Sequence, residues 1–136
     1  MPPKASDQTA LIALCVADLA LTKVAHANQL APGDLRMLCR LSVLAATGLR
    51  VTSRSLADIQ GCAISYTSKV CQVLIAAGLV ERFSRKDRTR PTPALLLTPA
   101  GSLLVSQVQR ELRAATRRLQ AVEMRPFARV IKKVQK

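Results

Sequence analysis

Residues 52–101 constrain the fold of this 136-residue chain more than any other stretch. Within them, apolar residues recur at helical spacing over 53–59 and again over 64–77, with a glycine between the two segments. Residues 79–83 are then expected to form a strand whose side chains alternate in and out, and after a charged tip residues 94–97 can return as a second strand. The sequence therefore predicts a helix, a tight turn, a second helix and a β-hairpin, in that order.

The turn between the two helices depends on Ala57 and Gly61. Ala57 precedes Gly61 by four residues, and a small side chain there lets two helices approach closely. Gly61 supplies the left-handed backbone conformation that such a turn needs. Thr67 and Val70, ten and thirteen residues after Ala57, are expected to anchor the second helix on the first. The side chains expected to face the interior are those of Leu56, Ala57, Ile59, Thr67, Val70, Cys71 and Leu74.

This order of elements is that of a winged helix-turn-helix, a module that lays its second helix in a groove of DNA. The charge agrees, because 21 Lys and Arg against 8 Asp and Glu give a net charge of +13, which indicates a polyanionic partner. Proteins that bind single strands stack the bases on aromatic side chains, and aromatic residues make up only 2% of this chain. The expected partner is therefore double-stranded DNA.

The fold class expected is mainly α, a winged helix-turn-helix with a small β-wing and N- and C-terminal dimerisation helices. The whole chain, 1–136, is interpreted as one domain, with dimerisation helices in 6–30 and 99–136 around a DNA-binding lobe of 32–98. From Asp7 to Ala27 the sequence is apolar on nearly every face, so a second surface must cover it, which indicates a homodimer. The C-terminal helix carries a clear apolar stripe, formed by Leu104, Val108, Leu112, Ala115, Leu119 and Val122.

Between these parts, a helix is expected from Pro32 to Ala46, ended by Gly48. Residues 49–52 are β-prone, so they are expected to add a short strand to the wing. Ser53 is then expected to cap the first helix of the helix-turn-helix, because serine is favoured at that position.

The N-terminal segment also requires a test for targeting. Ala10 to Ala17 is an apolar run, but Asp7 and Asp18 flank it closely and the run is far shorter than a membrane span. We therefore expect a helix of the mature protein, no membrane partner, and a cytoplasmic, nucleoid-associated location.

The cysteines form no C-x-x-C pair and have no histidine cluster nearby, which argues against a metal site. Their apolar contexts predict small, reduced core residues, at Cys15, Cys39, Cys62 and Cys71. His26 is the only histidine, no nucleophile has a neighbouring base, and no glycine-rich phosphate loop is present. The sequence therefore predicts no enzyme activity and no cofactor.

Short motifs in residues 56–101 are similar to those of a known family. In order they are Leu56-Ala57, Leu74, Gly78-Leu79-Val80-Glu81-Arg82, Asp87 with nearby arginines, and Leu97-Thr98-Pro99-Ala100-Gly101. Over about a third of the chain, this combination resembles the MarR family of bacterial winged-helix regulators. The resemblance implies a homodimer with interleaved terminal helices and two DNA-binding lobes. It also implies that the dimer recognises a near-palindromic operator and is released from it by a small phenolic ligand or an oxidant. The segment 87–98 is longer than usual in the family, and no residue set marks a ligand pocket, so the effector stays unidentified.

Three groups of residues are expected to contact DNA. The outward face of the second helix offers groups that can read base edges, from Ser65, Tyr66, Ser68, Lys69 and Gln72. The wing tip offers cations for the minor groove and flanking phosphates, from Arg85, Lys86, Arg88 and Arg90, with Asp87 expected to hold one of these arginines in place. Ser53 and Arg54, at a helix start, are expected to contact phosphate.

Two alternatives to a site-specific repressor stay open. The high positive charge also fits an architectural or replication protein that binds duplex DNA with little sequence preference. A redox-sensing repressor that uses Cys15 is the other, and it requires an accessible thiol of low pKa.

Overall fold

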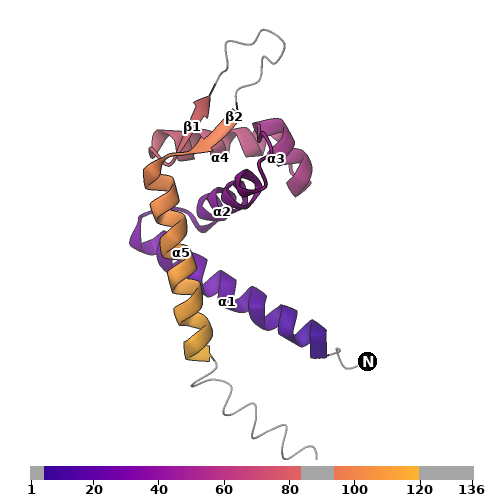
Figure 1. Ribbon diagram of the computed structural model, residues 1–136, viewed down its shortest axis with the longest axis vertical. Helices are drawn as coiled ribbons and strands as arrows, with labels where there is room; N and C mark the ends of the chain where they lie inside the picture. Colours follow the sequence, from indigo (N-terminus) through magenta and orange to yellow (C-terminus); the bar gives the residue numbers. More distant parts are fainter. Residues whose placement is uncertain (1–4, 84–93, 120–136) are drawn as a thin grey trace, which may run out of the picture.

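The computed structural model describes residues 5–83 and 94–119 (Figure 1). Its elements are α1 (Ala5–Ala27), α2 (Pro32–Ala46), α3 (Ser53–Gln60), α4 (Ile64–Ala76), β1 (Val80–Phe83), β2 (Ala94–Leu97) and α5 (Pro99–Arg118). The two strands, α3 and α4 lie at one end of the molecule over α2, whereas α1 and α5 extend away from that end and cross each other (Figure 1). This arrangement confirms the expected winged helix-turn-helix with flanking helices.

Helix α2 lies at the centre of an aliphatic core. Pro32 stands in its first turn, where the missing N–H costs no hydrogen bond. Leu35, Leu38 and Leu41 follow at three-residue spacing and are almost fully buried. Burying such a side chain contributes about 1.5–3 kcal/mol relative to leaving it exposed. The bounds of α2 are those predicted from the sequence.

The helix-turn-helix forms as expected, except at its first residue and at Ile59. Thr52, rather than Ser53, caps α3: its hydroxyl oxygen accepts from the Ser55 amide at 3.1 Å, while the Ser55 hydroxyl accepts from the Thr52 amide at 2.8 Å. This reciprocal pair satisfies two backbone donors together, which a cap at Ser53 would not do. Gly61 ends α3 with a φ of +66°, as its role in the turn requires.

Ile59 was expected inside, and this prediction is wrong, because its side chain is 59% exposed. It lies two residues after the buried Ala57, so it is turned about 160° from that side chain and leaves the face that packs on the core. The other expected interior residues are all buried, namely Leu56, Ala57, Thr67, Val70, Cys71 and Leu74.

The wing is a two-stranded antiparallel sheet in which Val80 pairs with Leu97 and Phe83 with Ala94. The expected third strand in 49–52 is absent from the described residues. One backbone bond remains of it, from the Leu95 amide to the Val51 carbonyl oxygen at 2.7 Å. The ladder cannot continue into Thr52, because the amide of Thr52 already donates to Ser55.

Helix α5 is joined to the wing by a close contact. The Thr98 hydroxyl donates to the Gly78 carbonyl oxygen at 2.6 Å and accepts from the Gly101 amide at 3.1 Å. The Thr98 amide donates to the Leu79 carbonyl oxygen at 3.1 Å. Gly101 lies directly over that carbonyl, since a Cβ built on Gly101 would come within 2.1 Å of the Leu79 oxygen. Only a residue without a side chain fits there.

The stripe predicted on α5 is confirmed for Leu104, Val108 and Ala115, which are buried, whereas Leu112 is partly exposed. Leu119 is partly buried, and Val122 lies outside the described residues. Helix α5 packs chiefly on α1. Near the end of α1, Lys23 pairs with Glu111 at 3.1 Å, and the Asn28 amide group donates to the Gln107 side-chain oxygen at 3.3 Å.

Helix α1 is covered on one side only. Leu11, Leu14 and Leu19 are 56%, 66% and 58% exposed, whereas Val16 and Ala20 are buried. By length and composition alone, residues 7–27 could also cross a membrane, with a mean hydropathy of 1.7 over the apolar window. The apolar stretch is thus longer than the run from Ala10 to Ala17, because Leu19, Ala20, Leu21 and Val24 continue it. The core helix of a protein that does not cross a membrane can have the same length and hydropathy. The exposed leucines are therefore better evidence than hydropathy that another surface covers α1.

We expect Gly101→Ala to lower the free energy of unfolding by about 3 kcal/mol, the upper end of the range for overpacked sites. The added methyl group would collide with the backbone oxygen of Leu79, which cannot move without breaking the Thr98 bond. Chemical denaturation measures the change. Gly33→Ala is the matched control, because a Cβ there lies 3.7 Å from the nearest atom, the Tyr66 hydroxyl oxygen. Equal loss in both variants would contradict the proposed clash.

Thr67→Val is expected to raise the free energy of unfolding by about 1 kcal/mol. Thr67 is 0% exposed, and its hydroxyl has no hydrogen-bond partner among the described residues. An unpaired buried hydroxyl costs about 1–3 kcal/mol, which an apolar group of similar shape avoids. The control is Thr116→Val, since the Thr116 hydroxyl is bonded to the Leu112 carbonyl oxygen at 2.8 Å on a partly exposed face. A loss of stability in Thr67→Val would show that the hydroxyl has a partner.

Candidate nucleic-acid interface

One face of α4 packs on the core, and the other face is exposed to solvent. Thr67, Val70, Cys71 and Leu74 point into the core, so the side chains between them project away from it. Ser65, Tyr66, Lys69 and Gln72 are exposed and Ser68 is partly exposed. These side chains offer hydroxyl, ammonium and amide groups along one helix face, the set that a base edge or phosphate can pair with. The structure brings together all the residues expected on this face.

Tyr66 is placed differently from its neighbours. Its side chain is 51% exposed, but the hydroxyl oxygen lies beside Gly33 in the first turn of α2. The phenol ring therefore extends along the start of α2, so its reach toward a base edge is shorter than that of Lys69 or Gln72. The sequence spacing along α4 places Tyr66 on the outward face but does not show this contact with α2.

The start of α3 presents Arg54 to solvent, as expected for a phosphate contact. Ser53 is only partly exposed, and its side chain is hydrogen-bonded to the thiol of Cys71. Burial raises the pKa of the Cys71 thiol, and this hydrogen bond and the charge of Arg82 partly offset the increase. Ser53 therefore contributes to the contact between α3 and α4, whereas Arg54 is available to an external anion.

The wing residues Arg85, Lys86, Asp87, Arg88 and Arg90 lie outside the described residues. The described strands fix where this segment begins and ends, because Phe83 and Ala94 are register partners. Both ends of the segment therefore leave the sheet side by side, at the same end of the molecule as α3 and α4 (Figure 1).

The sequence reasoning missed Arg82, which is exposed on β1 directly before the wing tip. Strand alternation would place Arg82 on the same face as the buried Val80, so the pattern that predicted the strand could not have identified its exposure. Arg40 on α2 is exposed as well, and its guanidinium group is hydrogen-bonded to the Gln60 side chain. These two residues add positive charge to the end of the molecule that carries α4.

The cysteines differ in exposure. Cys71 is buried, Cys39 and Cys62 are partly buried, and Cys15 is exposed on the uncovered side of α1. The prediction of a core position is therefore wrong for Cys15 in the single chain, since α5 covers the other side of the helix. Burial raises the pKa of the Cys39 thiol. Within residues 5–83 and 94–119, no group of three or more His, Cys, Asp or Glu could hold a metal ion.

The carboxyl group of Glu111 lies at the crossing of α1 and α5, between two cations. Its hydrogen bonds with Arg118 and Lys23 hold the pKa of the carboxyl below its usual range. Glu111 thus stays ionised and helps hold α5 to α1, on the part of the molecule away from α4.

Neither the family models nor the curated proteins contain a match to this chain. Solved structures do match it over nearly their whole length. The chain is 18% identical to apo MarR from E. coli, with a TM-score of 0.61 over 100% of this chain and 99% of that one. It is 16% identical to a MepR mutant from S. aureus bound to an oligodeoxyribonucleotide, with a TM-score of 0.68 over 98% and 97%.

A third match is the transcriptional regulator Tm0710 from Thermotoga maritima, with 15% identity and a TM-score of 0.68 over 97% of this chain and 91% of that one. At such low identity these likenesses establish the arrangement of helices and strands. The order of elements, the α3–α4 turn and the two-stranded wing agree with them. The chain therefore has the winged helix-turn-helix fold of the MarR family.

Proposed function

We propose that this chain belongs to the MarR family and is a transcriptional regulator that binds double-stranded DNA. The observation that carries the proposal is the exposed polar face of α4, beside a wing whose tip contains Arg85, Lys86, Arg88 and Arg90. Two proteins of the same fold support it, a MarR variant complexed with operator DNA and a MepR mutant bound to an oligodeoxyribonucleotide. The net charge of +13 is the sign that a nucleic-acid partner requires.

In the proposed complex, α4 enters the major groove. Gln72 can bridge the edge of an adenine, Lys69 can reach a guanine or a phosphate, and the hydroxyls of Ser65 and Ser68 can serve either. Arg54 contacts a phosphate near the start of α3, and the arginines of the wing grip the minor groove. Asp87 positions one of these arginines by a paired contact rather than touching DNA.

We further propose a homodimer in which 6–30 and 99–136 supply the contacts between subunits and 32–98 forms each DNA-binding lobe. Leu11, Leu14 and Leu19 support this assignment, because they leave an apolar surface on α1 that water does not favour. A twofold dimer presents two copies of α4 in opposite directions, so its operator is near-palindromic. Binding of such a site in a promoter would repress transcription, in a cytoplasmic, nucleoid-associated protein.

A low-specificity architectural protein is the second candidate, and the large positive charge favours it. Competition between a selected site and random duplex DNA distinguishes the two. Selection of bound sequences from a random library would give a near-palindromic consensus for the regulator and none for the architectural protein.

A redox-sensing repressor that uses Cys15 is the third, and it is favoured by the exposure of that thiol in the single chain. DNA binding that is indifferent to peroxide would exclude this candidate.

We expect DNA affinity to fall steeply with salt, by about 10³–10⁵ between 50 and 200 mM for a dimer that neutralises roughly 6–10 phosphates. Arg88→Ala with Arg90→Ala should flatten the slope, by about 0.9 for each phosphate that the variant no longer neutralises. Titrations at several salt concentrations measure it. Arg110→Ala with Arg113→Ala is the control, since both arginines are exposed on α5 away from α4 and should change the slope little.

Gln72→Ala is expected to weaken discrimination at one base pair by about 1–3 kcal/mol, because alanine cannot form the bidentate hydrogen bonds to adenine. Affinities for single-base variants of the selected operator measure this effect position by position. Arg54→Ala serves for comparison, as removing a phosphate contact would weaken binding to all sequences alike. A uniform decrease in Gln72→Ala would contradict the base contact.

A further inference from the structure

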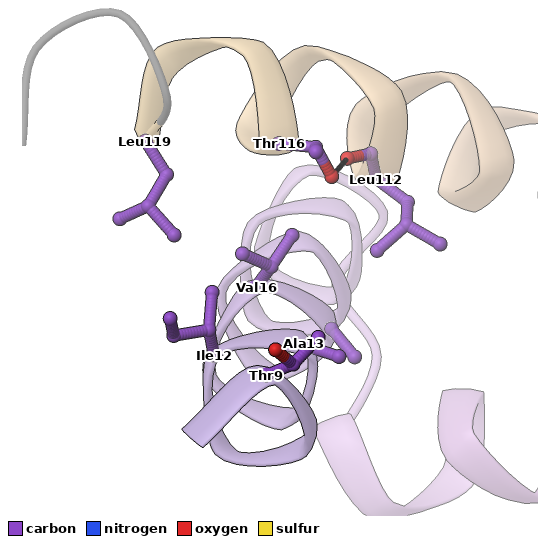
Figure 2. Close-up of a pocket in the computed structure, with 8 residues that line it drawn as sticks. Thr9, Ile12, Ala13, Val16, Leu112, Thr116 and Leu119 are labelled. Carbon is purple, nitrogen blue, oxygen red and sulfur yellow. Dashed lines mark hydrogen bonds between the residues drawn. The ribbon is translucent and has the colours of Figure 1, made fainter. Parts of the chain in front are cut away.

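Three arginines line the side of α5 that faces away from the rest of the protein. Arg110, Arg113 and Arg117 are exposed, and their spacing of three and four residues places them within about 60° of one another around the helix. The buried Val108 stands about two and a half turns before Arg117, so it points in the opposite direction. Leu119 likewise points from α5 toward α1 (Figure 2). The three arginines thus form an arginine ridge about 10 Å long.

The arginine ridge has no negative charge to pair with inside the described parts of the chain. Glu111, the nearest acid along the helix, is bonded to Lys23 and Arg118 on another side of α5. No salt bridge reaches a ridge arginine within residues 5–83 and 94–119. Like charges at spacings of three and four residues destabilise a helix. An anion bound from outside would relieve this repulsion.

The distribution of charge along the sequence also indicates a second anionic partner. Residues 32–98, the lobe proposed to bind the operator, contain ten Lys and Arg against four Asp and Glu, a net charge of +6. Residues 99–136 contain nine against two, a net charge of +7, and residues 1–31 are neutral. More than half of the excess positive charge therefore lies outside the lobe, and contact with the operator does not account for it.

The side chains around the arginine ridge decide which anionic partner fits. Ser106 and Gln109 are exposed beside it, and the nearest exposed apolar side chain on that side, Leu103, lies about two turns toward the wing. A protein partner would need aromatic or aliphatic anchors there, and a single strand would need aromatic platforms. A membrane surface would need an apolar helix face to insert, whereas the apolar face of α5 is buried.

The backbone of duplex DNA needs neither stacking nor apolar contact, because guanidinium groups pair directly with phosphate oxygens. Duplex DNA carries one negative charge per about 1.7 Å of its axis, so about six phosphates flank a ridge of this length. A second copy of the chain does not supply the anion, since each copy has a net charge of +13 and only eight acidic residues.

The arginine ridge lies far from the operator-binding face. Pro99, where α5 leaves the wing, is about 16 Å along the helix from Arg110 and about 27 Å from Arg117. Helix α5 extends away from the end of the molecule that carries α4 and the wing (Figure 1). A straight duplex held by α4 and the wing therefore lies at the other end of α5 from most of the ridge.

We propose that the arginine ridge on α5 binds the phosphate backbone of a second duplex segment without sequence preference, so that the regulator holds two DNA segments together. The contact at the ridge is independent of the operator. The bridging rests on the proposed function, because it requires α4 to hold an operator at the same time. A twofold dimer carries two such ridges.

Bridging is tested with the full chain bound to an immobilised operator duplex, to which a labelled duplex of random sequence is added. We expect the wild type to capture the labelled duplex, with an affinity that falls about 40-fold between 50 and 200 mM salt if one ridge neutralises three phosphates. The triple variant Arg110→Gln, Arg113→Gln and Arg117→Gln should capture at least tenfold less. Its operator affinity should change little, because α4 and the wing are intact.

Two further variants separate charge from structure. Lysine at all three ridge positions keeps the charge, so capture should stay within about threefold of the wild type. Arg118→Gln is the matched control for Arg113→Gln, since both arginines are exposed on α5 but Arg118 is paired with Glu111. Arg113→Gln should lower the salt slope of capture by about 0.9 and Arg118→Gln should leave it nearly unchanged.

Four results would overturn the proposal. The first is no capture by the wild type, and the second is equal capture by the triple glutamine variant, which would show that the second lobe of a dimer holds the labelled duplex. The third is a loss with lysine as large as that with glutamine, which would make the arginines structural. The fourth is ridge-dependent binding to phosphatidylglycerol vesicles without capture of duplex, which would assign the ridge to a membrane surface.

Failure of the arginine ridge and failure of the proposed function give different results. Operator binding without ridge-dependent capture would overturn the ridge and leave the proposed function. Binding of random duplex that selects no operator, persists in Lys69→Ala with Gln72→Ala and is lost in the triple glutamine variant would do the reverse. The ridge contact would then stand, and the proposed regulator with its bridging would be refuted.

Discussion

The aliphatic stripe on α2 is the interaction on which the other elements depend. Leu35, Leu38 and Leu41 are almost fully buried, and α2 contacts α1, α4, β2 and α5. The aromatic side chains among the described residues, Tyr66 and Phe83, are exposed, so density in the core comes from branched aliphatic side chains that meet at one helix. The helix-turn-helix, the wing and the long helices are thereby held on a common support. The orientation of α4 follows from this packing, because its buried residues must face α2.

The sequence was sufficient where a residue's role depends on its near neighbours. The burial of Val70 and Leu74, the turn at Gly61 and the pairing of the two strands all follow from periodicity and backbone preference. The exposed face of α4 then follows as the complement of its buried face. For this reason the candidate DNA-contacting residues on α4 could be named before the structure, although the direction of Tyr66 could not.

The sequence was insufficient where two local preferences compete or where a distant element decides. Thr52 is β-prone and also a good cap, and its bond with Ser55 removes the amide that a third strand would need. Cys15 lies in an apolar run, and only the position of α5 decides that it faces away from the core. The closeness of Gly101 to the Leu79 oxygen is likewise a tertiary contact, which no spacing in the sequence reports.

Helix α5 joins the N-terminal helix to the wing through contacts at two places along its length. The Lys23–Glu111 pair and the Asn28–Gln107 hydrogen bond hold α5 to the end of α1. About 18 Å further along the helix, Thr98 and Gly101 hold its start to Gly78 and Leu79. The position of α1 relative to the wing therefore depends on one continuous helix, because both sets of contacts lie on α5.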